Sequence, residues 1–127
     1  MGTAPRNIQD RTFEFGVRII RLVDRLPRTI AGMKIGQQLI ESGTSVGANM
    51  QEADAAESKK DFVHKTGIAL KEAQESHYWL RLIDATLFPN DAEVTALNRE
   101  AYELSRVLGA IKRSAQQAKT RKPVTPA

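Results

Sequence analysis

Several features that would place a protein in a particular class are missing from this sequence. It contains no cysteine, so neither a disulfide framework nor thiolate chemistry is expected. No apolar run approaches the roughly 20 residues that a transmembrane helix needs, and the first residues, MGTAPRNIQDR, lack the apolar core of a signal peptide. We therefore expect a soluble, cytoplasmic protein with no membrane partner.

A catalytic constellation is also missing. We find no nucleophile on a Gly-x-Ser-x-Gly turn. The stretch from Gly43 to Gly47 has two glycines, but it lacks the Lys and the preceding strand of a phosphate loop. We predict that the protein is not an enzyme.

The histidines do not fit a metal centre. A di-iron bundle needs two carboxylate-x-x-His pairs and two further Glu residues from facing helices. Asp61 and His64 form one such pair, but Gln74 stands three residues before His77. We predict no metal and no cofactor, and a metalloenzyme stays the hypothesis that elemental analysis of the purified protein would reject.

Charge is unevenly distributed along the 127 residues, which have a net charge of +4. The last acidic residue is Glu103, and the basic residues beyond it include Lys112, Arg113, Lys119, Arg121 and Lys122. Without them the rest of the chain is close to neutral. A basic end suits a polyanionic partner, and it equally suits a tail that only keeps the protein soluble.

The first predicted helix begins at Asp10 or Thr12, either of which can cap it, and runs to about Leu26. Its apolar residues form two adjacent stripes: Phe15, Ile19, Leu22 and Leu26, and beside them Phe13, Val17, Ile20 and Val23. So wide an apolar face predicts contact with two neighbouring elements.

Arginines follow the other face of this helix at heptad spacing. They are Arg11, Arg18, Arg21, Arg25 and Arg28, and Glu14 and Asp24 offset them only in part. Two interpretations remain open: a solvated face with local ion pairs, or a ridge that faces phosphate groups.

Pro27 ends the first helix because it cannot donate to the preceding turn, and Thr29 can cap a second helix that runs to about Ala56. Gly36, Gly43 and Gly47 all fall within it. Each glycine costs about 1 kcal/mol relative to alanine inside a helix, so their presence predicts close packing against a neighbour or a bend near Gly43.

Two further helices complete the chain. The third is capped by Ser58 or Asp61 and ends at Pro89, and the fourth is capped by Asn90 or Asp91 and runs to about Ala118. Apolar heptad stripes and short connectors favour sequential antiparallel packing. The predicted fold is all-α, an antiparallel up-down-up-down four-helix bundle over residues 10–118, with a flexible N-terminus (1–9) and a basic, proline-containing disordered tail (119–127).

Several polar and aromatic residues of the central helices are ambiguous. Asn49, Glu52, Lys71 and Glu75 are predicted to form a polar layer that sets the bundle register or an oligomer contact, although a ligand site is the alternative. Tyr78 and Trp79 are expected in the core or at a subunit contact, since the low aromatic content, 6%, argues against a base-stacking platform.

Four segments carry a resemblance to a known family: GTSVGANMQEA (43–53), SKKDFVHK (58–65), IALKEAQE (68–75) and YWLRLI (78–83). They resemble the bacterial four helix bundle protein family, first noticed as reading frames in intervening sequences of large-subunit rRNA genes, some of which carry a ribosomal-protein-like name. The resemblance covers roughly residues 10–115. Many relatives have Ile-Pro-Ala-Asn-Ile-Ala-Glu-Gly where this chain has VGANMQEA (46–53), which places it in a branch of the family.

The resemblance implies a homopentamer and no enzymatic activity. A distant relative, the accessory protein of diversity-generating retroelements, is a similar basic pentamer that binds nucleic acid and a reverse transcriptase. Our first hypothesis is therefore a pentameric module that binds RNA or DNA; the alternative is a scaffold for a protein partner with no nucleic-acid role. The candidate nucleic-acid-binding residues are Arg18, Arg21, Arg25, Arg28, Lys112, Arg113, Lys119, Arg121 and Lys122.

Overall fold

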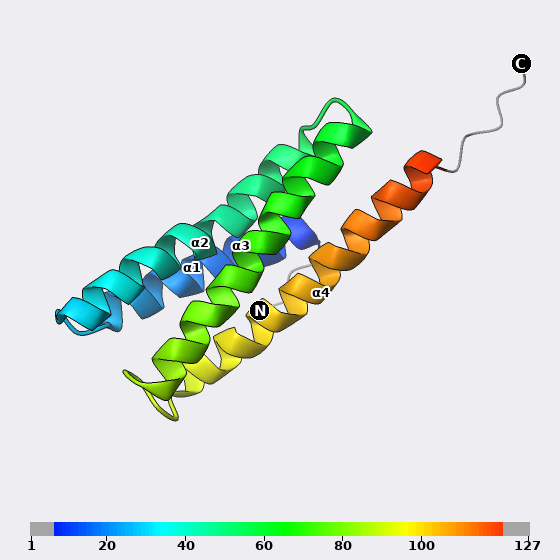
Figure 1. Cartoon of the computed structure of the whole chain (residues 1–127). Helices are drawn as coiled ribbons and strands as arrows, with labels where there is room; N and C mark the ends of the chain where they lie inside the picture. The colour runs from blue at the N-terminus through cyan, green and yellow to red at the C-terminus, as the bar shows by residue number, and fades with distance from the viewer. Residues whose placement is uncertain (1–6, 121–127) are drawn as a thin grey trace, which may run out of the picture.

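The computed structural model describes residues 7–120, which form four helices. These are α1 (Ile8–Arg25), α2 (Ile30–Asp54), α3 (Lys59–Ala85) and α4 (Ala92–Thr120) (Figure 1). No strand occurs within that range, and the all-α prediction is confirmed. Arg121, Lys122 and the side chain of Lys119 lie outside the described residues, as do most of the N-terminal and C-terminal segments that were predicted to be disordered.

The start of α1 differs from the prediction because Asn7, rather than Asp10 or Thr12, caps it. The side-chain oxygen of Asn7 accepts a hydrogen bond of 2.8 Å from the backbone N–H of Asp10. The hydroxyl of Thr12 instead donates to the carbonyl oxygen of Ile8 within the helix. An Asx cap before the first apolar residue satisfies an otherwise unpaired N–H group.

The caps of the other three helices are among those predicted. The hydroxyl oxygens of Thr29 and Ser58 each accept a hydrogen bond of 3.0 Å from the backbone N–H of the third residue after them. A carboxylate oxygen of Asp91 accepts a hydrogen bond of 3.1 Å from the backbone N–H of Val94. The third helix is shorter than expected, since it ends at Ala85 before the connector that contains Pro89.

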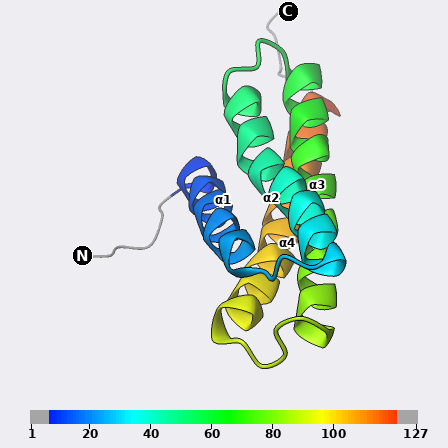
Figure 2. The same cartoon turned by 90° about the vertical axis from the view of Figure 1, so that its left-hand side faces the viewer.

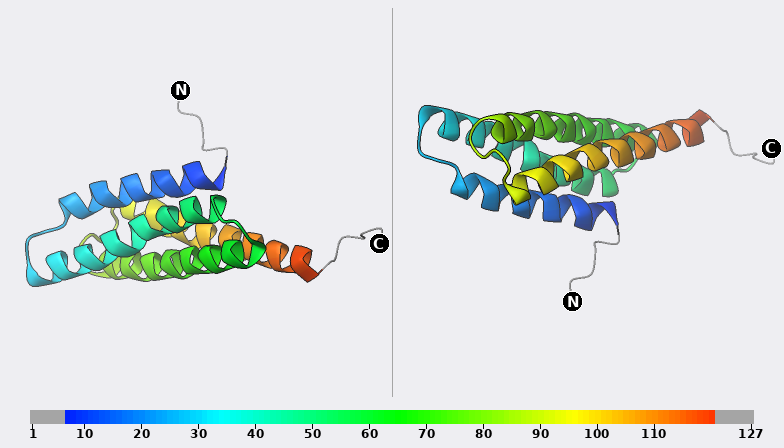
Figure 3. Two further views of the ribbon diagram at one scale, coloured as in Figure 1. Left: turned by 90° about the horizontal axis from the view of Figure 1, so that it is seen from above. Right: turned by 90° about the horizontal axis from the view of Figure 1, so that it is seen from below.

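Consecutive helices pack side by side and antiparallel, and α1 also touches α4 over a smaller surface, while the diagonal pairs α1–α3 and α2–α4 do not meet. This is the predicted up-down-up-down four-helix bundle (Figure 2). Both views in Figure 3 show that α4 extends well past the N-terminal end of α1. The C-terminal half of α4 is therefore not covered by α1.

The core follows the predicted stripes. From α1 it takes Phe15, Ile19, Leu22 and Leu26, and from α4 it takes Val94, Leu97, Ala101, Leu104 and Leu108. In the middle of α3 the buried residues are small, and Ala69, Ala73 and Ser76 let the backbone of α2 approach. At that point Ser76 and Ser42 share a buried hydrogen bond of 2.9 Å.

The glycines of α2 allow close packing against α1, which is the first of the two explanations predicted for them. A Cβ atom on Gly43 would lie 2.8 Å from both γ carbons of Ile19, and one on Gly47 would lie 3.1 Å from the carbonyl oxygen of Thr12. The helix continues through both positions without interruption. Because Gly43 and Gly47 have no side chains, α1 can pack directly against α2. This contact sets the orientation of α1 in the bundle.

Candidate nucleic-acid interface and subunit contact

The arginine row of α1 faces carboxylates at the start of α4. At heptad spacing, three arginines each pair with one acidic residue: Arg11 with Glu100 (2.7 Å), Arg18 with Glu93 (2.9 Å) and Arg25 with Asp91 (2.5 Å). Their partners lie 66 to 89 residues away in sequence. Ion pairing is thus the interpretation that the geometry favours for this part of the row, and the pairs are long-range rather than local.

The pairing alters the ionisation of both partners. The hydrogen bond with Glu100 is the main cause that raises the pKa of Arg11, and the hydrogen bond from Arg25 is the main cause that lowers the pKa of Asp91. Exposed pairs of this kind stabilise a fold only weakly. Their more important effect is to neutralise Arg18 and Arg25, two of the predicted phosphate-binding residues.

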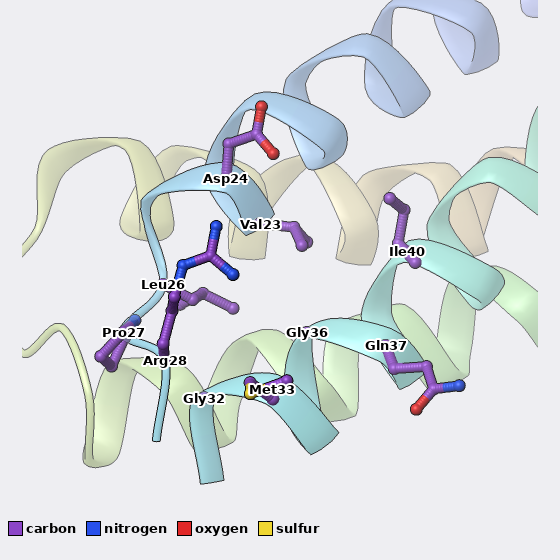
Figure 4. A pocket seen from close by; sticks show the side chains of 10 residues that line it. All are labelled: Val23, Asp24, Leu26, Pro27, Arg28, Gly32, Met33, Gly36, Gln37 and Ile40. Atoms are coloured by element: carbon purple, nitrogen blue, oxygen red, sulfur yellow. The ribbon is translucent and has the colours of Figure 1, made fainter. Parts of the chain in front are cut away.

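Arg21 and Arg28 remain available on the same side of the bundle. Both are exposed, and neither forms an ion pair with any residue in the described range. Figure 4 shows Arg28 rising from the connector between α1 and α2 toward the turn that carries Asp24, beside a hollow of about 370 Å³. The predicted ridge is therefore reduced to two separate cations.

A second group of cations lies on the outside of α3 and α4. The rings of His77 and Tyr102 come together there with centroids 6.0 Å apart and planes tilted by 50°. The guanidinium of Arg106 lies 6.0 Å from the centre of the Tyr102 ring. Burial, and after it the charge of Arg81, lowers the pKa of His77, so Arg81 completes the group from the α3 side.

Lys112 and Arg113 continue this group toward the C-terminal end of α4. The ammonium nitrogen of Lys112 lies 3.3 Å from where a Cβ atom on Gly67 would be, so the side chain reaches across to α3. Arg113 lies over Gly109 in the same way, at 3.4 Å. We name the following residues the α3–α4 face: His77, Arg81, Tyr102, Arg106, Lys112 and Arg113.

Only Lys112 and Arg113 of the α3–α4 face were predicted as candidates; Arg81, Tyr102 and Arg106 were missed. The sequence spacing indicates part of this arrangement. His77 and Arg81 are four residues apart and share a face of α3, and Tyr102 and Arg106 do the same on α4. Which of these pairs meet depends on the register of α3 against α4, and that register is visible only in the folded structure.

Large apolar side chains are exposed along α1 and the start of α2. Phe13 is 68% exposed, Ile20 43%, Ile30 91% and Met33 60%. Phe13 and Ile20, together with Val17, also line a mainly apolar hollow of about 360 Å³ between α1 and α2. We name this group, Phe13, Val17, Ile20, Ile30 and Met33, the α1–α2 surface. The second stripe of the first helix is thus left open within one chain.

The four residues of the predicted polar layer do not come together within one chain. The amide of Asn49 donates to the carbonyl oxygen of Ser45 within α2, Glu52 forms an ion pair of 2.6 Å with Lys65, and Glu75 accepts a hydrogen bond from the Trp79 indole. Glu52, Lys71 and Glu75 are all exposed. The i,i+3 and i,i+4 spacings place these residues at the edges of their helices, where each finds a local partner or solvent.

The aromatic pair on α3 is divided between the two expected environments. Trp79 is half-buried and packs against the core, whereas Tyr78 is 51% exposed and meets the Trp79 ring edge-on at 5.1 Å. Trp79 therefore has a structural role, and Tyr78 remains on the surface.

Ser45 does stand in a Gly-x-Ser-x-Gly match, contrary to the expectation from the sequence, since residues 43–47 read GTSVG. In the structure Ser45 lies inside α2 and its hydroxyl donates to the carbonyl oxygen of Glu41 at 2.7 Å. A nucleophile of that class needs a strained strand-to-helix turn. The helix provides none, so the match carries no catalytic meaning here.

Neither a metal cluster nor a membrane span is visible in the part of the chain that the structure covers. No three His, Cys, Asp or Glu side chains there come together in a way that would hold a metal ion. No helix among residues 7–120 is both long and apolar enough to cross a membrane.

Comparison with known proteins identifies the family. A solved structure with the same fold is a protein of unknown function from the S23 ribosomal protein family of Bacteroides thetaiotaomicron. It has 34% sequence identity and a TM-score of 0.74, and the alignment covers 84% of this chain and 98% of that chain. No curated protein sequence matches. A sequence model of the 23S rRNA-intervening sequence proteins matches residues 6–110. The chain therefore belongs to the 23S rRNA-intervening sequence protein family.

Proposed function

We propose that this protein is a non-enzymatic, homopentameric assembly of four-helix bundles that binds RNA or DNA through its basic surface. The observation that carries the binding role is the α3–α4 face, whose cations Arg81, Arg106, Lys112 and Arg113 form no ion pair within the described part of the chain. Cations that are free to contact phosphates bind nucleic acid by releasing its counterions. Several copies in one assembly strengthen a weak contact through effective concentration.

The assembly is supported by the α1–α2 surface. Soluble monomers rarely leave contiguous apolar patches of large area exposed, and here Phe13, Ile30 and Met33 are each more than half exposed. A second copy of the chain is the occupant we propose, and the number of five follows from the family resemblance. Light scattering should give a mass five times the 14.1 kDa of one chain.

The assembly is tested by Phe13→Ser combined with Ile20→Ser, which removes apolar area from the surface without changing charge. The variant should lose the oligomeric mass and remain helical. Glu14→Ser is the matched control, because it changes an exposed residue on the same helix outside the α1–α2 surface. A monomeric wild-type protein at micromolar concentration would refute the assembly.

Nucleic-acid binding is tested by fluorescence anisotropy of labelled structured RNA and duplex DNA across a salt series. Affinity should fall log-linearly with salt, as phosphate contacts require. The alternative, a scaffold for a protein partner, is favoured by one observation: α4 carboxylates neutralise three of the α1 arginines. Absence of binding to either probe at ~50 mM salt, a condition that strengthens phosphate contacts, would leave the scaffold as the function.

A further inference from the structure

We propose that the α3–α4 face is a binding site for single-stranded nucleic acid, in which Tyr102 stacks on an unpaired base while Arg81, Arg106 and Lys112 contact the flanking phosphates. This inference rests on the proposed function and makes it specific. It names one face, one strandedness and one stacking residue, none of which follows from a basic net charge.

The first support is the exposure and surroundings of Tyr102. Its side chain is 50% exposed on α4, and the ring of His77 and the guanidinium of Arg106 each lie 6.0 Å from the centre of its ring. A half-open aromatic ring beside arginine is the arrangement by which single-strand-binding proteins hold bases, since every base has a π-face. Bases inside a duplex are already stacked and cannot use the ring in this way.

The second support is the charge that surrounds the ring. Arg81 approaches from α3 and acts on His77, and Lys112 reaches from α4 across Gly67. Tyr102, and after it the charge of Glu103, raises the pKa of Arg106, but Arg106 and Glu103 form no ion pair within the described residues. The face is therefore basic on both sides of Tyr102.

The third support is length. From Tyr102 to Lys112 the face runs about 15 Å along α4, at ~1.5 Å per residue. At a rise of ~3.4 Å per nucleotide, this corresponds to about four stacked nucleotides. That matches the lower end of the site sizes of single-strand-binding folds, roughly 4 to 16 nucleotides. The side chains of Lys112 and Arg113 lie over Gly67 and Gly109, so they add two cations along this length.

The α1 arginines offer a natural contrast. Arg11, Arg18 and Arg25 have carboxylate partners on α4, and the row has no aromatic ring among its cations; the one arginine–aromatic contact near it is that of Arg25 with Phe88, at 5.0 Å. Lys34 on α2 is exposed, forms no ion pair in the described range and belongs to neither set of candidate residues, so it is the cation control for Arg81.

The experiment measures anisotropy with labelled single-stranded oligo(U) RNA, oligo(dT) DNA of about 15 nucleotides and a duplex of the same length, using the full chain. Tyr102→Ala should weaken single-strand binding by roughly 5- to 150-fold, the range measured for the loss of one stacked base, and Tyr102→Phe should restore it. The salt slope of Tyr102→Ala should equal that of the wild type, because stacking releases no counterions. Equal affinity for the oligo(U) and oligo(dT) probes would indicate that stacking and phosphate contacts suffice for binding. A higher affinity for oligo(U) would indicate readout of the 2′-hydroxyl.

Arg81→Ala should behave differently, with a reduction of the salt slope by ~0.7, the value for one phosphate contact on a single strand. Lys34→Ala should leave both affinity and slope unchanged. Circular dichroism and light scattering of each variant verify that fold and mass are retained.

Two failures are distinguishable. If the wild-type protein binds none of the three probes, the nucleic-acid function itself is wrong and the site falls with it. The nucleic-acid function survives, and the assignment to the α3–α4 face is overturned, in any of three cases. The wild type binds but prefers the duplex, Tyr102→Ala binds as the wild type does, or Lys34→Ala weakens binding as much as Arg81→Ala.

Discussion

Replacement of Gly43 by alanine tests the contact that orients α1, and with it the α1–α2 surface. The added Cβ atom would lie 2.8 Å from two carbons of Ile19, a distance that Cβ atoms do not tolerate. Ile19 is completely buried and cannot swing into solvent. Overpacking in a tight core costs about 1–3 kcal/mol, so Gly43→Ala should destabilise the fold despite the better helix propensity of alanine.

Gly109→Ala is the matched control because it makes the same chemical change inside another helix. There the nearest atom to the new Cβ would be the terminal nitrogen of the flexible Arg113 side chain, at 3.4 Å. That side chain can move, so the propensity gain of about 1 kcal/mol should be expressed in full. Since both variants receive this gain, the difference between them isolates the steric cost, about 1–3 kcal/mol.

The assay is urea unfolding followed by circular dichroism at one fixed protein concentration, because association would make apparent stability depend on concentration. Gly43→Ala should unfold at lower urea than the wild type or close to it, and Gly109→Ala at higher urea. Equal stability of the two variants would show that α1 does not rest on α2 at Gly43, and the positions of Phe13 and Ile20 would then need revision.

Two further predictions concern charged groups. Arg18→Ala and Glu93→Ala should each lower the unfolding free energy by less than about 1 kcal/mol in urea melts, and the coupling between them should shrink in 1 M salt, because the pair is partly exposed. Burial, and after it the charge of Glu75, raises the pKa of Glu72, so its ionised form is disfavoured in the folded state. Glu72→Gln should therefore be more stable than the wild type near pH 7, and urea melts should show that advantage disappearing as the pH falls below the ordinary glutamate pKa of about 4.3; an advantage that persists in acid would contradict this cause.

The helices and the core were predictable because their signals are local and periodic. Phe15, Ile19 and Leu22 recur at helical spacing, and all three are buried. Thr29 and Ser58 stand directly before apolar-periodic segments, and both are caps. The exception at the start of α1 has the same local origin, since Asn7 offers a cap three residues before Asp10.

The electrostatics of the site could not be predicted because their partners are distant in sequence. Arg18 has Asp24 and Glu14 as its nearest acidic neighbours along the chain, yet its actual partner is Glu93. Heptad spacing shows that cations share a face, but it does not show which helix lies opposite. Tyr102 was overlooked for the same reason, since its meeting with His77 requires the register between two helices.

The length of α1 decides which cations of the bundle remain free. The acidic residues of α4 stop at Glu103, and the row of α1 arginines ends at its N-terminal side with Arg11, which pairs with Glu100. Past that point α1 provides no further helix, and a shallow apolar hollow of about 550 Å³ opens against α4, lined in part by Phe62 and Ile111. Acidic residues early and basic residues late in α4 both suit its dipole, so one helix neutralises α1 arginines with its first half and presents Arg113 to solvent with its second.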